Sequence, residues 1–196
     1  MSRRDLLYLH GFRSSPRSTK AQQMGALIAQ RQALGEDWTW QCPQLPPSPA
    51  EAWSLIERSL SALPEHRRAV IGSSLGGFYA TVAAERFGCP AVLINPAVDP
   101  ARDLARYIGE ITAWHSEERF WFRAEFIDEL RALTPGALTR PERYFVLVAQ
   151  GDEVLDWREM AGRYAGTRLT VLEGGDHALS SFPDHLDNIL SFLEHA

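Results

Sequence analysis

One serine lies where the sequence could convert it into a nucleophile. Ser74 is the centre of residues 72–76, GSSLG, which match the pattern G-x-S-x-G. The pattern falls where a β-rich run passes directly into a helical pattern, and a serine at such a turn presents its hydroxyl above the edge of a sheet. Glycines two residues before and two residues after it remove side chains that would collide there. Ser74 is therefore the predicted nucleophile.

A serine hydroxyl is a weak nucleophile until a base accepts its proton, so a histidine is required elsewhere. His177 follows the last β-rich run, in residues 173–178, EGGDHA, where glycines leave its ring free to reach the serine. Sites of open α/β sheets form at this carboxyl edge of the strands. The patterns place His66, His185 and His195 in or beside helices, on predicted solvent faces. His177 is the predicted base.

The base needs a carboxylate to orient its ring. Asp152 directly follows the fifth β-rich run, at the same predicted edge of the sheet. Glu153, the next residue in that loop, is expected to point away, and Asp176 is expected to diverge from the adjacent histidine. Asp156 has the position of a helix cap, and Glu159 completes a capping-box pattern. Asp152 is therefore the preferred acid.

The order of these residues also carries information. Ser74, Asp152 and His177 occur in this sequence along the chain. Serine, acid, histidine is the chain order of the α/β-hydrolase fold, and the other well-known serine hydrolase folds use different orders. The order supports this fold independently of the serine motif.

Attack on an acyl carbon also requires donors for the oxyanion that develops on the carbonyl. The Leu75 N–H is one candidate, because it begins the predicted helix after the serine. The fold usually takes a second donor from the loop after an early strand. Here His10 and Gly11 end the first β-rich run in a sharp turn. We predict that the backbone N–H groups of Phe12 and Leu75 form the oxyanion hole, with His10 in a structural role.

Short β-rich runs alternate with helical patterns along the chain, which predicts an α/β fold with a mostly parallel sheet of about six strands and helices on both faces. The expected strands are residues 6–10, 38–42, 69–73, 91–95, 144–150 and 169–172. The expected helices begin at Ser18, run over about 50–63 and 75–87, follow Asp156, and begin again near Ser181.

An insertion interrupts this alternation between the fourth and fifth strands. It spans about residues 97–141, where a crossover helix needs only about a dozen residues. Its aromatic side chains could line a pocket or fill the core, and we predict that Trp114, Trp121 and Phe122 contact the substrate. The insertion is short for a full lid, so we expect a minimal cap, a small or open pocket, and a preference for short to medium acyl chains.

Composition limits the remaining possibilities. The 196 residues predict a single domain over 1–196, and the net charge of −5 gives no general attraction for nucleic acid. No apolar stretch has the length of a membrane span, so we expect no membrane partner and a cytoplasmic location. Cys42 and Cys89 form neither a disulfide framework nor a metal pattern, so no metal site is expected.

Several motifs together resemble the α/β-hydrolase superfamily and, within it, the YqiA-like bacterial esterase family. The matching stretches are residues 6–12 (LLYLHGF), 43–47 (PQLPP), 72–77 (GSSLGG), 95–98 (NPAV), 151–156 (GDEVLD) and 173–178 (EGGDHA). The resemblance implies a compact hydrolase that acts on small-molecule acyl esters or thioesters without a metal or organic cofactor. It also implies Ser74, Asp152 and His177 as the catalytic triad.

Two alternatives remain open at this point. The same triad could serve an acyltransferase or a hydrolase of other carbonyl bonds. The chain could also be a non-catalytic binding protein on the same fold, since fold does not imply function. Arg13, Arg17 and Lys20 follow the oxyanion loop and could meet an anionic carrier, or could simply be a solvated loop and helix start.

Overall fold

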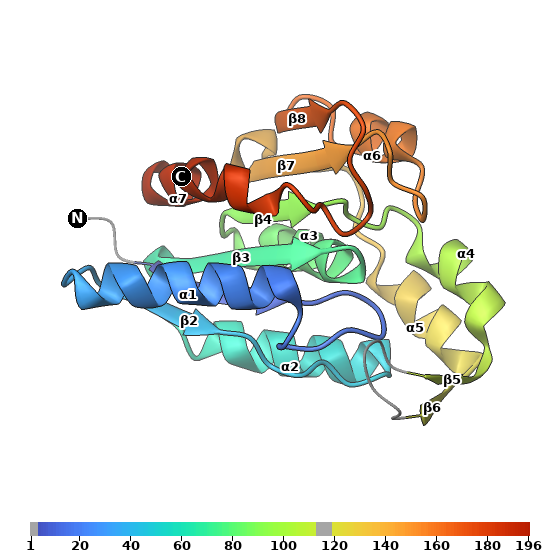
Figure 1. Cartoon of the computed structure of the whole chain (residues 1–196). Coiled ribbons are helices and arrows are strands. Elements are labelled where there is room, and N and C mark those ends of the chain that lie inside the picture. Colours follow the sequence, from blue (N-terminus) through green and yellow to red (C-terminus); the bar gives the residue numbers. More distant parts are fainter. Residues whose placement is uncertain (1–3, 113–118) are drawn as a thin grey trace.

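The computed structural model of the chain describes residues 4–112 and 119–196 (Figure 1). Its central feature is a six-stranded sheet in which every neighbouring pair is parallel, in the order β2-β1-β3-β4-β7-β8. The strands are β1 (Arg4–Leu9), β2 (Trp38–Gln41), β3 (Arg68–Ser73), β4 (Ala91–Ile94), β7 (Tyr144–Ala149) and β8 (Arg168–Leu172). The predicted α/β fold and its six parallel strands are confirmed.

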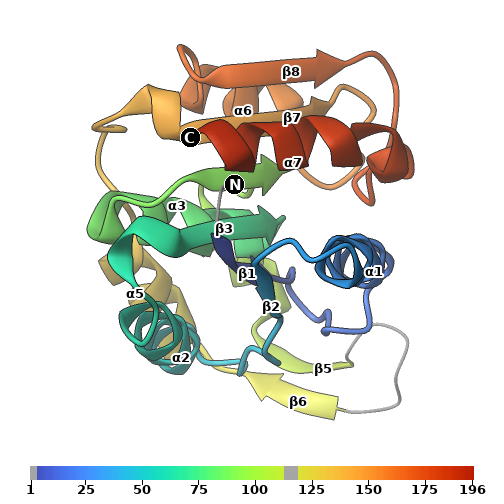
Figure 2. The ribbon, with the colours of Figure 1, turned by 90° about the vertical axis from the view of Figure 1, so that its left-hand side faces the viewer.

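Helices cover both faces of this sheet (Figure 2). α1 (Thr19–Ala33) and α7 (Leu186–His195) lie on one face, and α2 (Pro49–Ser61) and α3 (Leu75–Phe87) lie on the other. Because successive side chains of a strand point to opposite faces, one strand serves two cores. In β1, Leu7 and Leu9 pack into the core beneath α2 and α3, whereas Leu6 and Tyr8 pack into the core beneath α1.

The insertion between β4 and β7 has secondary structure of its own. It contains α4 (Pro100–Leu104), β5 (Gly109–Thr112), β6 (Arg119–Phe122) and α5 (Glu125–Leu133). β5 and β6 form a separate antiparallel pair in which Ile111 lies opposite Phe120. The sequence patterns did not predict these two strands.

Two local predictions were wrong. The last helix does not begin near Ser181, because Phe182–His185 form a 3-10 turn and α7 begins only at Leu186. The predicted capping box at α6 (Trp157–Arg163) is also not formed. Asp156 caps this helix as expected, but the carboxylate of Glu159 pairs instead with Arg102, at 2.7 and 2.8 Å.

Candidate active site

The chain turns from strand to helix at a single residue, Ser74. β3 ends one residue before it and α3 begins one residue after it, and Ser74 itself has φ of 57° and ψ of −121°. Its N–H donates to the Ile94 carbonyl and its carbonyl accepts from the Ala97 N–H, both at 3.0 Å. A non-glycine residue in this region is strained, and the two hydrogen bonds to the end of β4 hold it there.

Glycine is required where the turn folds back on itself. A Cβ atom on Gly72 would lie 2.1 Å from the carbonyl oxygen of Gly76. No pair of non-bonded atoms approaches so closely, so only glycine allows α3 to start this near the end of β3. The hydroxyl of Ser74 therefore lies beyond the carboxyl end of the central strands.

His177 brings its ring to this hydroxyl from the loop after β8. Its Nε2 lies 3.0 Å from Ser74 Oγ, and its Nδ1 lies 2.8 Å from Asp152 Oδ2. A carboxylate can only accept, so Nδ1 carries the proton and donates it to Asp152. Nε2 is then left with its lone pair directed at the serine hydroxyl, which is the arrangement that a general base needs.

The carboxylate of Asp152 is completely buried and fully bonded. Its exposed fraction is 0%, and its Oδ1 accepts the N–H groups of Val154 and Leu155, each at 2.8 Å. Two backbone donors on one oxygen leave the other oxygen for His177. The loop that follows β7 thus fixes the carboxylate before it meets the imidazole.

The rival acids have other partners. Asp156 accepts the Arg158 N–H at 2.9 Å, and the carboxylate of Asp176 binds Ser180. Glu153 does not point away from the histidine, as the sequence suggested. Its Oε2 accepts the backbone N–H of His177 at 2.9 Å, so it contacts the peptide of His177 and not the ring.

The two residues predicted to form the oxyanion hole both lie close to the serine. A Cβ atom on Gly11 would be 3.2 Å from Ser74 Cβ, so the loop that carries Phe12 runs directly beside the serine. Leu75 is the first residue of α3, and the N–H groups of a first helical turn have no acceptor within the helix. Phe12 and Leu75 both line the cavity above Ser74.

That cavity has a volume of about 120 Å³ and an apolar lining near the serine. Besides Ser74, His177, Phe12 and Leu75, it is bounded by Ala97, Pro100, Leu104, Tyr107, Val154 and Leu155. Arg13, Asp103 and Arg106 supply its charged groups. The site can therefore hold a small apolar group next to the serine.

A known protein family covers nearly the whole chain. Residues 5–194 match the model of a family described as "Uncharacterised protein family (UPF0227)". The chain belongs to this family. The family resemblance predicted from the motifs is thereby confirmed.

Solved structures similar to this UPF0227 chain share its fold. The lipolytic enzymes LipS and LipT, derived from a metagenome, match with a TM-score of 0.70 at 20% identity, over 100% of this chain and 95% of that one. Mouse alpha/beta hydrolase domain-containing protein 10 has a TM-score of 0.68 at 18% identity, over 96% and 90%. The esterase domain of a Rhodothermus marinus protein matches with a TM-score of 0.68 at 19% identity, over 95% of this chain and 84% of that one. The α/β-hydrolase fold of the UPF0227 chain is thus confirmed.

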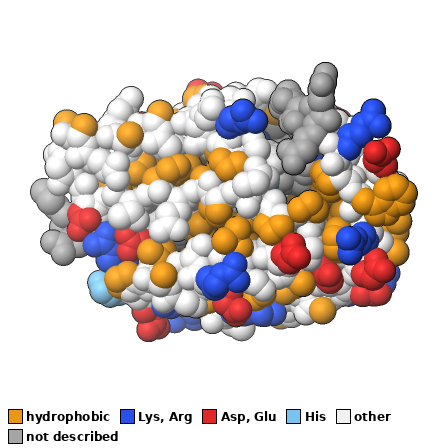
Figure 3. Space-filling model, turned by 90° about the horizontal axis from the view of Figure 1, so that it is seen from below, with side chains coloured by type: hydrophobic (Ala, Val, Ile, Leu, Met, Phe, Trp, Pro, Cys, Tyr) orange, Lys and Arg blue, Asp and Glu red, His pale blue; other side chains and the backbone are white. Residues whose placement is uncertain are grey.

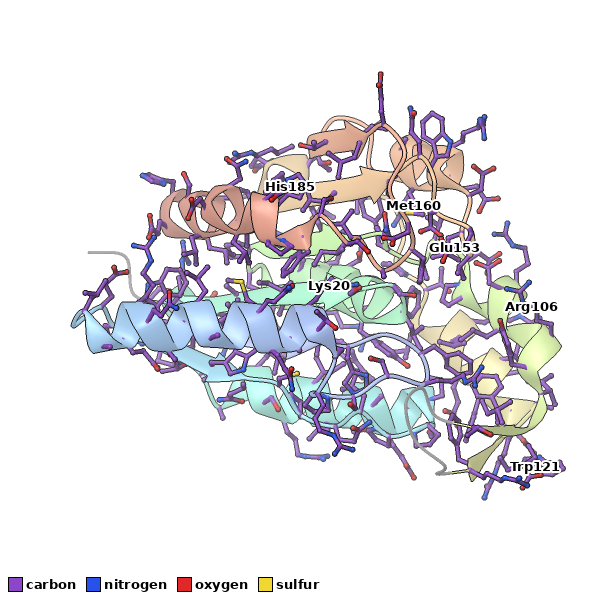
Figure 4. The ribbon with its side chains drawn as sticks, in the orientation of Figure 1. Lys20, Arg106, Trp121, Glu153, Met160 and His185 are labelled. Atoms are coloured by element: carbon purple, nitrogen blue, oxygen red, sulfur yellow. The ribbon has the colours of Figure 1, made fainter. Side chains whose placement is uncertain are left out.

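The predicted substrate contacts in the insertion need correction. Trp114 lies outside the described residues. Trp121 is 63% exposed on β6, where it lies opposite Glu110, and it is far from Glu153 of the site (Figure 4). Phe122 is buried behind Phe12, with ring centroids 5.2 Å apart. Neither Trp121 nor Phe122 lines the cavity above the serine.

Exposed apolar side chains gather at this end of the molecule. Among the described residues, Ile108 and Trp121 are large exposed hydrophobic residues here, and the space-filling view shows hydrophobic side chains among charged ones (Figure 3). None of the helices in residues 4–112 and 119–196 has the length and hydropathy needed to cross a bilayer.

Three insertion residues that line the cavity were not predicted from the sequence. Leu104 and Tyr107 come from α4 and the turn after it, and Pro100 begins that helix. The Asp99-Pro100 pair is a helix-start signal, since Asp99 caps the helix by accepting the Arg102 N–H at 3.1 Å. That signal would have predicted a helix beginning at Pro100.

A larger cavity of about 760 Å³ lies at the opposite, amino end of the strands. Its lining includes arginine, glutamate and histidine side chains, and two of the arginines bond to carbonyls at or near helix ends. Arg68 Nε donates to Leu63 O at 3.1 Å and Arg4 Nε donates to Leu193 O at 2.7 Å. These contacts follow α2 and occur in α7, where cations stabilise the negative helix terminus. We therefore interpret the arginines of this cavity as residues that stabilise the fold.

Proposed function

We propose that the protein is a serine hydrolase of carboxylic esters or thioesters. The observation that carries this proposal is the pair of hydrogen bonds that joins Ser74 Oγ to His177 Nε2 and His177 Nδ1 to Asp152. Ser74 lies at the end of this chain that lines the cavity, where the lining is apolar. The names of two structurally similar proteins, lipolytic enzymes and an esterase domain, favour the same chemistry.

The proposed reaction proceeds in two halves. Nε2 of His177 accepts the Ser74 proton while Oγ forms a bond to the acyl carbon, and the N–H groups of Phe12 and Leu75 hold the oxyanion. The bond to the alcohol or thiol then breaks, and His177 returns the proton to that leaving group. In the second half, His177 accepts a proton from a water molecule while the water oxygen forms a bond to the acyl carbon. The bond from that carbon to Oγ then breaks, His177 returns the proton to Ser74, and the acid leaves. Asp152 stabilises the imidazolium in both halves.

The size of the cavity suggests the acyl group. At about 120 Å³, it is well below the volume of roughly 300–1,000 Å³ that is usual for sites of drug-sized ligands. We therefore propose a preference for short acyl chains. Hydrolysis rates that rise steadily from acetyl to dodecanoyl p-nitrophenyl esters would contradict this preference without contradicting the mechanism.

Labelling with a fluorophosphonate tests the mechanism directly. We expect the intact mass of the wild type to increase by one label, and Ser74→Ala to remain unlabelled. Ser73→Ala, which removes the neighbouring buried hydroxyl, is the matched control and should label. Rates for an ester and a thioester with the same acyl group would show which leaving group is preferred. A wild type that neither labels nor turns over ester would favour the non-catalytic binding protein.

A further inference from the structure

The backbone around His177 is held by side chains from separate parts of the fold. Asn95, at the end of β4, donates from Nδ2 to the carbonyls of Asp176 and His177, at 3.0 and 3.1 Å. Glu153 accepts the His177 N–H at 2.9 Å. Both polar groups of the His177 main chain are therefore bonded to side chains, one from each direction.

Asn95 also reaches the strand that leads to the acid. Its Oδ1 accepts the Ala149 N–H at 2.8 Å, at the end of β7 and three residues before Asp152. Only one orientation of the amide satisfies all three bonds, because an N–H needs the oxygen and two carbonyls need the nitrogen. One side chain thus joins the loop of the base to the strand of the acid.

The position of Asn95 is specialised for this contact. The residue is 0% exposed and has φ of 41°. Asparagine tolerates this left-handed region better than most residues other than glycine, but a buried amide is costly unless it is bonded. Its three hydrogen bonds offset the free energy that burial of the amide costs.

We propose that Asn95 and Glu153 are positioning residues that set the location of the His177 ring relative to Ser74 and Asp152. This inference rests on the proposed function for its effect on rate. Asn95 fixes the carbonyl side of the peptide and couples it to β7, and Glu153 fixes the N–H side. Lys20, at the start of α1, donates to the next carbonyl, that of Ala178, and supports the same loop.

Substitution of Asn95 by aspartate tests the first half. Asn95→Asp keeps the shape and the acceptor for Ala149, but it replaces the donor with an oxygen that faces two carbonyls. A displacement of the base by about 1 Å costs about 10²-fold in rate, so we expect the rate of fluorophosphonate labelling to fall by about that factor. Asn188→Asp, the same change at an exposed position of α7, should label at the wild-type rate.

A purely structural role must be separated from positioning. Thr81→Val removes a buried hydrogen bond of 2.8 Å to Tyr164 that is not part of the His177 loop, and serves as a variant of reduced stability. We expect Thr81→Val to keep the downfield proton signal of an imidazole bonded to a carboxylate, and Asn95→Asp to lose or shift it. Equal signals and equal labelling rates in both variants would overturn the proposal for Asn95.

Glu153 is tested by rescue. Glu153→Ala should slow labelling and speed hydrogen exchange of the His177 amide, whereas Glu153→Gln, which retains an acceptor oxygen, should restore both towards wild type. Equal behaviour of the two variants would overturn the role of this hydrogen bond. Hydrogen exchange of the His177 amide does not depend on catalysis. A wild type that fails to label would therefore refute the proposed function, and the exchange rates would still test the hydrogen bond from His177 to Glu153.

Discussion

The main chain of Gly76 lies directly against the carbonyl of Leu9. A Cβ atom on Gly76 would be 1.9 Å from that oxygen, which is less than a non-bonded contact allows. The first turn of α3 and the end of β1 therefore touch through bare backbone, immediately beside Ser74.

Because that oxygen belongs to a buried strand, neither partner can move aside. We expect Gly76→Ala to lose more than about 3 kcal/mol of the free energy of unfolding, or not to fold. Gly162→Ala in α6 is the control, since nothing lies within 4 Å of its Cβ position. Alanine there should be neutral or stabilise by about 0.4–1 kcal/mol. Thermal unfolding followed by circular dichroism measures both, and similar melting temperatures would refute the prediction.

The assignment of the acid predicts a difference between two nearby aspartates. Asp152→Asn should lower kcat/KM for a short-chain ester by about 10⁴-fold, because an amide favours the wrong tautomer of His177. Asp156→Asn should leave kcat/KM near wild type, because this side chain caps α6. Steady-state kinetics measure both variants. A larger loss of kcat/KM in Asp156→Asn would indicate that Asp156, and not Asp152, orients His177.

Two neighbouring aromatic residues of β6, Trp121 and Phe122, should respond differently to substitution by alanine. Phe122 is 1% exposed, so Phe122→Ala is expected to cost about 3–5 kcal/mol of the free energy of unfolding. Trp121→Ala removes an exposed ring and should change that free energy by less than about 0.5 kcal/mol, with kcat/KM unchanged. Urea denaturation measures the first effect. A marked loss of ester hydrolysis in Trp121→Ala would return this residue to the binding site.

His10 predicts a loss of stability in acid. Burial lowers the pKa of His10, whose Nε2 accepts the Leu45 N–H at 3.0 Å. The unfolded chain takes up the proton first, so this contribution is complete above the ordinary pKa of about 6.5 and is lost as the pH falls below it. Melting temperatures between pH 4 and 8 should fall more steeply for the wild type than for His10→Gln. Parallel curves would show that His10 does not contribute.

The parts of the fold that could be predicted were those with local patterns. The central strands β1, β3, β4 and β7 are short runs of mostly buried residues, and each predicted triad residue lies within five residues of the end of a strand. Parallel strands place their carboxyl ends at one edge, so the sequence was enough to bring Ser74, Asp152 and His177 to the same edge.

The insertion lacked such patterns. Trp121 and Phe122 are both aromatic, so their residue types do not show which one is buried. Neighbouring residues of a strand point to opposite faces, and the burial of each depends on how β6 pairs with β5. The contacts of Asn95 join groups 81 and 82 residues apart, and no periodicity reports a hydrogen bond of that kind. The burial of Phe122 and the contacts of Asn95 could not be predicted because both depend on segments that meet only in the folded chain.

The sheet order also has a consequence for the chain as it leaves the ribosome. The first four strands of the large sheet, β1 to β4, all lie before residue 95, so the turn at Ser74 can close while synthesis continues. β7 and β8 add to the β4 edge only after the insertion has been made. Until then His177, the proposed base, is missing, so by the proposed mechanism Ser74 of a nascent chain could not be acylated by substrate, even with the first four strands in place.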